Sequence, residues 1–185
     1  MSNVLNKLCG PLATDELLWE LCEFRSLDQG PPNWFALKSG KPLQVVGGDA
    51  TGGRFCTLTA SGKSAGRLLH IDSEGSAGVI AASLAEGIRM MIALPYWRDC
   101  LKFSGGGELA EMRRAQARLE VELRRRRPGI DTERDALYAS FDLSAPTAPL
   151  DALHKTVAGS AKTRVIARSD DSPMGSLFNT FVVKD

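Results

Sequence analysis

Residues 41–60 have the sequence KPLQVVGGDATGGRFCTLTA, and this stretch decides the class of fold. An apolar run at 43–46 leads into a segment of four glycines and one aspartate, and a run with aromatic and β-branched residues leads out of it at 54–60. Short Asp/Gly connections between two such runs are typical of β-hairpins. We therefore predict two antiparallel strands, at 41–46 and 54–60, joined by a tight turn.

A phosphate-binding loop is the alternative interpretation of a glycine-rich segment. Such a loop has a glycine five positions before a Gly-Lys-Ser/Thr triplet, so that the backbone amides and the lysine reach the same phosphates. The triplet occurs at residues 62–64, but Thr57 occupies the required glycine position. Residues 47–49 do not fit the GxGxxG spacing, and Arg54 opens a predicted strand instead of a helix. The glycines are therefore interpreted as turn residues.

Two more strands follow at similar spacing. They are predicted at residues 67–72 and 79–82, and Gly- and Ser-rich turns precede them at 61–66 and 73–78. Short strands joined by such short connections favour an antiparallel meander.

A capped helix ends this run of strands. Ser83 and Glu86 have the spacing of a capping box, in which the serine hydroxyl accepts a hydrogen bond from the amide of Glu86. Leu84 and Ile88 begin an apolar stripe at helical spacing, which predicts a helix over residues 84–94 that packs on the sheet.

The remaining segments extend this pattern on both sides. We predict further helices at 15–27, 108–127, 132–141 and 150–159, and strands at 163–167 and 176–183. The predicted fold is a single α+β domain over residues 1–185, with a twisted antiparallel sheet and helices packed on it. Its core spans about 14–104, and about 105–185 form a C-terminal extension.

Composition places the chain among ordinary globular proteins. Its 185 residues are 43% hydrophobic and 24% charged, with a net charge of +1, so no global field favours nucleic acid or a membrane as partner. No run of about 18 apolar residues is present, and the N-terminus lacks the features of a signal peptide. We predict a cytoplasmic protein whose four cysteines are free thiols, at positions 9, 22, 56 and 100.

Residues with catalytic chemistry are few and scattered. His70 and His154 lie in a predicted strand and a predicted helix, without the Cys/His spacing of a zinc site, and are interpreted as structural histidines. A thiol hydrolase that uses Cys100 with a distant histidine stays open as an alternative. The sequence otherwise predicts no catalytic residue, no cofactor and no metal.

An arginine run at 124–127 raises a second alternative. Together with the arginines at 113, 114 and 118, it allows a nucleic-acid-binding regulator that uses the helix at 108–127. Against this alternative, cations in the last turn of a helix also stabilise the helix itself, glutamates at 108, 111, 120 and 122 offset their charge, and aromatic content is only 6%.

The order of these elements resembles the SUKH superfamily, the Smi/Knr-type proteins, over about residues 45–100. Three matches carry the resemblance: an Asp-Gly-Gly turn before an aromatic strand, a strand that runs into an acidic loop, and a small-residue strand that ends in serine before a helix. The matching residues are Asp49, Gly52, Gly53 and Phe55, then Leu68 to Asp72 with Glu74, then Ala81, Ala82, Ser83 and Leu84.

The resemblance implies a non-enzymatic bacterial immunity protein. Such proteins bind and neutralise a cognate toxin, often a nuclease or a deaminase, inside the cell that produces it. On this interpretation the contacts with the toxin come from the strand-connecting loops. The candidate contact residues are Trp34, Asp49, Arg54, Asp72 and Glu74.

Overall fold

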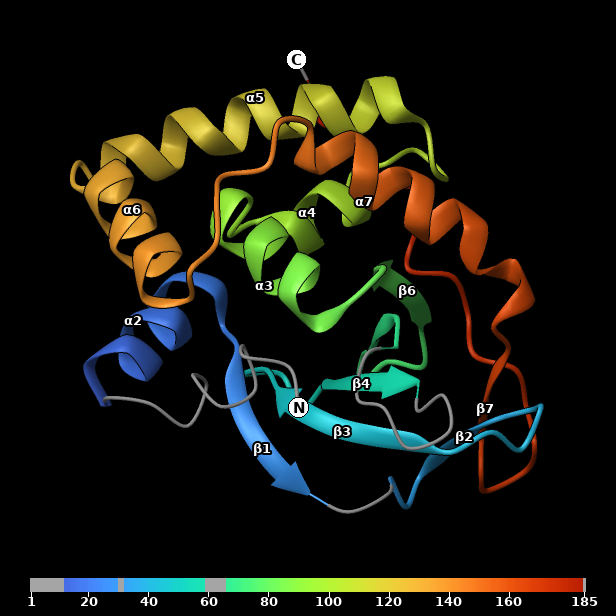
Figure 1. Ribbon diagram of the computed structural model, residues 1–185. Coiled ribbons are helices and arrows are strands. Elements are labelled where there is room, and N and C mark those ends of the chain that lie inside the picture. Colours follow the sequence, from blue (N-terminus) through green and yellow to red (C-terminus); the bar gives the residue numbers. More distant parts are fainter. Residues whose placement is uncertain (1–11, 30–31, 59–65, 185) are drawn as a thin grey trace.

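The computed structural model describes residues 12–29, 32–58 and 66–184, and it has the expected α+β architecture (Figure 1). Five antiparallel strands form the main sheet, in the order β1-β3-β4-β5-β6. These strands are β1 (Arg25–Gln29), β3 (Leu43–Gly48), β4 (Arg54–Leu58), β5 (Leu68–Ile71) and β6 (Ala77–Ala81). The predicted meander is therefore confirmed from β3 to β6. Most of the turn expected at 61–66 lies outside the described residues.

Both faces of this sheet are covered, because neighbouring residues along a strand point to opposite sides. Phe55 packs into one apolar cluster beneath the helices, whereas Cys56 packs into a second cluster on the other face. Leu68 and Leu69 divide between the clusters in the same way. A strand covered on both faces is buried at consecutive positions, and all four residues of β5 are buried, including His70.

Helices cover the first face (Figure 1). They are α2 (Leu12–Cys22), α3 (Leu84–Ala93), α4 (Trp97–Lys102), α5 (Leu109–Arg126), α6 (Ile130–Ser140) and α7 (Pro149–Ala158). Helix α3 begins as predicted, since the Ser83 hydroxyl accepts a hydrogen bond of 3.2 Å from the amide of Glu86. No helix of the described ranges has both the length and the apolar character needed to cross a membrane.

The C-terminal third is built into this core. Met112 of α5, Leu137 of α6 and Leu153 of α7 are buried in the same cluster as α3. After the short 3-10 helix η1 (Gly159–Lys162), strand β7 (Val165–Ala167) pairs with β2 (Phe35–Leu37) in a separate two-stranded sheet. Phe35 and Val165 of this small sheet belong to the apolar cluster on the second face of the main sheet.

The first predicted helix, at 15–27, is wrong at its C-terminal end. Helix α2 stops at Cys22, and Glu23 has a positive φ of 51°, a conformation that ends helices. Residues 25–29 then form β1, which pairs with β3 as the edge of the sheet. Tertiary pairing therefore overrides the helical apolar spacing in this segment.

The strand predicted at 176–183 is also wrong. This segment runs beside the α4–α5 connection, where the Gly105 amide donates to the Phe181 carbonyl (2.9 Å) and the Gly106 amide to the Asn179 carbonyl (2.8 Å). The Asn179 amide also donates to the Leu101 carbonyl of α4 (3.2 Å), so the segment turns to the α4–α5 region and does not extend the bridge that Gly175 forms with Ser76 beside β6. Two further elements, β2 and α4, were not predicted from the sequence.

Candidate functional site

Two hairpin turns meet at one end of the main sheet. The β3–β4 turn (49–53) and the β5–β6 turn (72–76) are neighbours because Arg54 pairs with Ile71 in the sheet register. A Cβ atom placed on Gly52 would lie 3.9 Å from Cβ of Ser73. We call these two turns the hairpin end. Three of the five candidate contact residues belong to it, namely Asp49, Asp72 and Glu74, and a fourth, Arg54, directly follows the first turn as the first residue of β4.

The buried carboxylate of Asp49 holds the first turn in shape. The side chain of Asp49 is fully buried, and Oδ1 accepts hydrogen bonds from the Thr51 amide (2.9 Å), the Thr51 hydroxyl (2.7 Å) and the Gly53 amide (2.9 Å). Burial opposes ionisation of this carboxyl, but hydrogen bonds from His70, Thr51 and Gly53 outweigh it and lower its pKa to about 2. Asp49 therefore organises the turn and is not itself a surface contact.

The second carboxylate oxygen of Asp49 joins distant parts of the fold. It lies 2.8 Å from Nε2 of His70 on β5 and 2.9 Å from Nη1 of Arg98 on α4. Arg98 also forms an ion pair with Glu23, at the junction of α2 and β1. The ring of His70 packs between Phe55 and Trp97, with centroid separations of 4.9 and 5.0 Å. These contacts connect the turn to β4, β5, α4 and the α2–β1 junction.

An Asp–His pair is also the core of a general-base dyad, but this one is closed to substrate. His70 is 2% exposed, and its partner Asp49 is nearly as deeply buried. A base must reach the proton that it removes. The pair therefore acts as a structural link, as the sequence indicated for His70. Arg98 and Glu23 were missed, since nothing in the sequence spacing connects them to the turn.

The second turn has its own aspartate. Oδ1 of Asp72 accepts hydrogen bonds from the amides of Glu74 (2.9 Å) and Ser76 (2.7 Å), which fixes the turn. The Glu74 side chain is exposed. Arg54 is half-buried and donates to the carbonyls of Gly52 (2.8 Å) and Gly53 (3.0 Å). Of the four candidates at this end, Glu74 is therefore the exposed side chain and Arg54 is half-buried.

Trp34 lies elsewhere. It precedes β2 and stacks edge-on against Phe35, at a centroid separation of 4.5 Å, while its carbonyl accepts a hydrogen bond from the Arg168 amide. In the described part of the chain no hydrogen bond or ring contact joins Trp34 to the hairpin end. The structure therefore separates it from the other four candidates.

The described cysteines are buried, free thiols, as predicted for Cys22, Cys56 and Cys100. Cys9 lies outside the described residues. Burial raises the pKa of the Cys100 thiol to about 12, which keeps it protonated at neutral pH. A nucleophilic cysteine needs the opposite environment, so the geometry gives no support to a thiol hydrolase. The described ranges also contain no group of three or more His, Cys, Asp or Glu residues able to hold a metal ion.

The arginines at 124–127, at the C-terminal end of α5, form ion pairs within the chain. Arg124 pairs with Glu120 and Asp131, and Arg125 pairs with Glu122. Arg126 shares that glutamate, and Arg127 pairs with Glu133 and with Glu20 of α2. These pairs neutralise much of the positive charge that suggested nucleic-acid binding.

An exposed apolar surface lies where α5 meets residues 179–184, which we call the tail. Val121, Phe181 and Val182 are 69%, 54% and 47% exposed. They border a groove with a volume of about 830 Å³, to which Phe103 and Leu119 also contribute. We call this region the α5–tail surface. The sequence analysis missed it because the tail was predicted to be a paired strand.

The chain was compared with protein-family models, curated proteins and solved structures, and none of them matches it.

Proposed function

We propose that this chain is a non-enzymatic protein-binding protein, acting in the bacterial cytoplasm as an immunity protein for a cognate toxin. The observation that carries the binding role is the α5–tail surface, where three large apolar side chains are about half exposed or more. The toxin as partner follows from the SUKH resemblance of residues 45–100. The mechanism is occlusion of the active site of the toxin.

The chemistry of the α5–tail surface suits a protein partner. Exposed apolar side chains that gather around one groove mark interaction sites more often than isolated ones do. A stable interface buries roughly 800 Å² on each partner and places apolar anchors at its centre. Phe181 and Val121 are such anchors, and polar groups such as Arg118 and Glu122 line the same groove.

The tail that forms half of this surface is held in place. Arg118 of α5 donates a hydrogen bond of 2.7 Å to the carbonyl of Lys184. The Gly105 amide donates a hydrogen bond of 2.9 Å to the Phe181 carbonyl. A surface ordered in advance costs a partner less conformational entropy on binding.

The hairpin end is the second candidate contact region of the same function. Arg54 and Glu74 present their side chains there, and Asp49 and Asp72 hold the turns in shape. Its charges are mixed, so it suits specificity more than affinity.

Co-purification with the product of the adjacent gene tests the proposal. The two proteins, expressed together with one of them tagged, are expected to elute as one complex in which the activity of the neighbour is suppressed. The immunity role would be refuted if the adjacent gene encodes an unrelated metabolic enzyme and the two proteins form no complex.

A further inference from the structure

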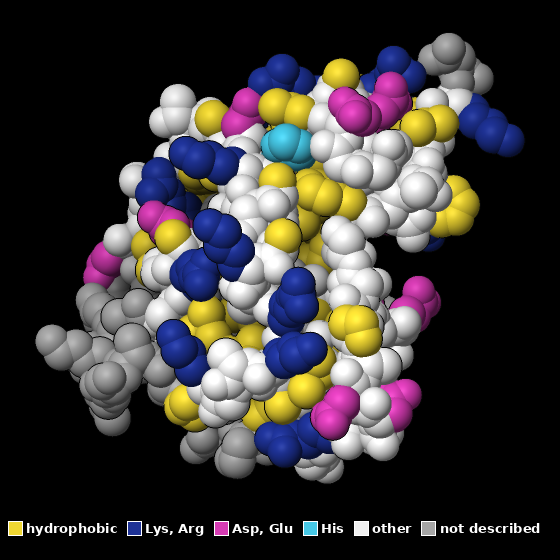
Figure 2. Space-filling model, turned by 90° about the vertical axis from the view of Figure 1, so that its right-hand side faces the viewer, with side chains coloured by type: hydrophobic (Ala, Val, Ile, Leu, Met, Phe, Trp, Pro, Cys, Tyr) yellow, Lys and Arg dark blue, Asp and Glu magenta, His cyan; other side chains and the backbone are white. Residues whose placement is uncertain are grey.

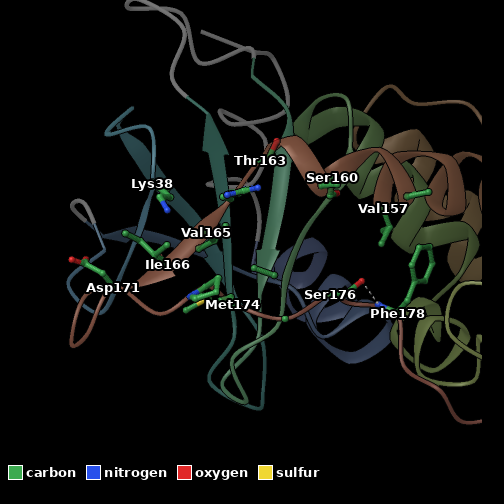
Figure 3. Close-up of a pocket in the computed structure, with 16 residues that line it drawn as sticks. Lys38, Val157, Ser160, Thr163, Val165, Ile166, Asp171, Met174, Ser176 and Phe178 are labelled. Carbon is green, nitrogen blue, oxygen red and sulfur yellow. Dashed lines mark hydrogen bonds between the residues drawn. The ribbon is translucent and has the colours of Figure 1, made fainter.

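A second groove, of about 550 Å³, lies on another part of the molecule, between the α7–η1–β7 segment and residues 171–178 (Figure 3). It extends from Lys38 and Asp171 at one end to Val157 and Phe178 at the other. Its lining also includes apolar side chains of β7 and the following segment, namely Val165, Ile166 and Met174.

Exposed cations line this groove or lie in the segments that form it. Lys38 and Arg164 line it, and their backbones are joined by a hydrogen bond from the Lys38 amide to the Arg164 carbonyl (2.9 Å). Lys162 lies in η1, between lining residues, and Lys155 lies one helical turn before Ala158. Figure 2 shows lysine and arginine side chains gathered around apolar ones on this face. We call the groove and these four cations the basic groove.

These cations lack the compensation seen along α5. Within the described ranges, none of the four side chains forms an ion pair, whereas the arginines at 124–127 all do. Asp171 is the acidic residue that lines the groove. On a chain with a net charge of only +1, this face therefore carries an excess of positive charge, which Asp171 offsets only in part.

We propose that the basic groove binds an acidic segment of a partner protein. An apolar side chain of that segment would sit on Val165, Ile166 and Met174, and its carboxylates would pair with Lys38, Arg164 and their neighbours. Charge complementarity of this kind speeds encounter and fixes the register of a bound segment.

The lining favours a protein segment over a nucleic acid. Single-stranded nucleic acids bind on exposed aromatic platforms between cations. The aromatic residue in this groove, Phe178, already packs against the ring of His154, at a centroid separation of 5.5 Å. An apolar hollow that holds no row of aromatic rings suits an aliphatic or aromatic side chain of a peptide.

This site does not depend on the proposed immunity function. The basic groove shares no lining residue with the α5–tail surface. A variant that removes toxin binding at the α5–tail surface would therefore leave the basic groove intact. Either proposal can be refuted while the other stands.

Titration of the ¹⁵N-labelled chain tests the proposal. The probe is a synthetic peptide with a Leu-Phe pair flanked by glutamates, and its twin carries lysines in place of the glutamates. The acidic peptide is expected to shift amide signals at 38, 157–166 and 171–178, and the twin is expected to shift none of them. The double variant Lys38→Glu/Arg164→Glu should weaken binding about tenfold or more, since it removes two ion pairs.

A charge-matched variant, Arg113→Glu/Arg125→Glu, is the control and should bind the peptide as the unmodified chain does. Both side chains of the test variant are exposed, so its amide spectrum should remain that of a folded protein. Absence of shifts at the groove, equal shifts with the lysine twin, equal loss in the control, or tighter binding of an oligonucleotide at these residues would each overturn the proposal.

Discussion

The Asp49 carboxylate and Nε2 of His70 lie 2.8 Å apart, although 21 positions separate the two residues in the sequence. This contact connects the β3–β4 turn to strand β5, and Arg98 extends it to α4. The glycine-rich stretch is therefore held by an internal aspartate, and the missing side chain of Gly53 leaves space for that aspartate.

Replacement of Asp49 by alanine should destabilise the protein by about 3 kcal/mol. The change leaves Arg98 and His70 without their shared partner in a largely buried place, and broken buried pairs cost of this order. Urea unfolding followed by circular dichroism measures the loss. A midpoint equal to that of the unmodified chain would contradict the structural role of this cluster.

The same carboxyl should make stability depend on pH in the acid range. Its pKa is about 2 in the folded protein against an ordinary 3.8, so its contribution is fully present above about pH 4 and disappears as the pH falls towards 2. The free energy of unfolding of the unmodified chain should exceed that of Asp49→Asn at neutral pH. The difference should shrink by about 2 kcal/mol across that interval. A constant difference would contradict the low pKa.

Gly53→Ala should destabilise the fold by about 2 kcal/mol or more. A Cβ atom at this position would lie 2.5 Å from Oδ2 of Asp49 and 2.9 Å from Nε2 of His70, and both of these atoms are held by their own contacts. Gly159→Ala is the control, since its Cβ meets no atom within 4 Å and its φ of −73° suits any residue. Equal midpoints of thermal unfolding for Gly53→Ala and Gly159→Ala would contradict this packing.

The thiols at 22, 56 and 100 should resist modification in the native protein. All three are buried, and burial raises their pKa values, to about 12 for Cys56 and for Cys100. In a Cys9→Ser background, a disulfide reagent should react fully only after denaturant is added. Rapid reaction of one native thiol, located by mass spectrometry, would reopen the question of a reactive cysteine.

The local signals in the sequence were sufficient for the meander and for α3. The short strands β3 to β6 with their Gly-rich turns, and the Ser83 cap, depend on residues close together in the chain, which pattern analysis detects. The same reasoning identified the hairpin turns that hold Arg54 and Glu74.

Long-range contacts explain what the sequence analysis missed. Strand β1 forms because β3 offers it an edge, and the backbone of the tail is hydrogen-bonded to residues 105–106 instead of to a strand. Arg98 reaches Asp49 across 49 positions. The arginine run suggested a binding site, but its charges are paired within the chain. The cations at 38 and 164 are far apart in the sequence, and only folding makes them neighbours.

Calorimetric titration with the product of the adjacent gene tests the central claim most directly. The variant Val121→Glu/Phe181→Glu should lose at least about 100-fold in affinity, because it places charges among the apolar anchors. Ala136→Glu, on the exposed side of α6, should bind as the unmodified chain does. Unchanged affinity in the double variant, or no complex with the unmodified chain, would contradict the account.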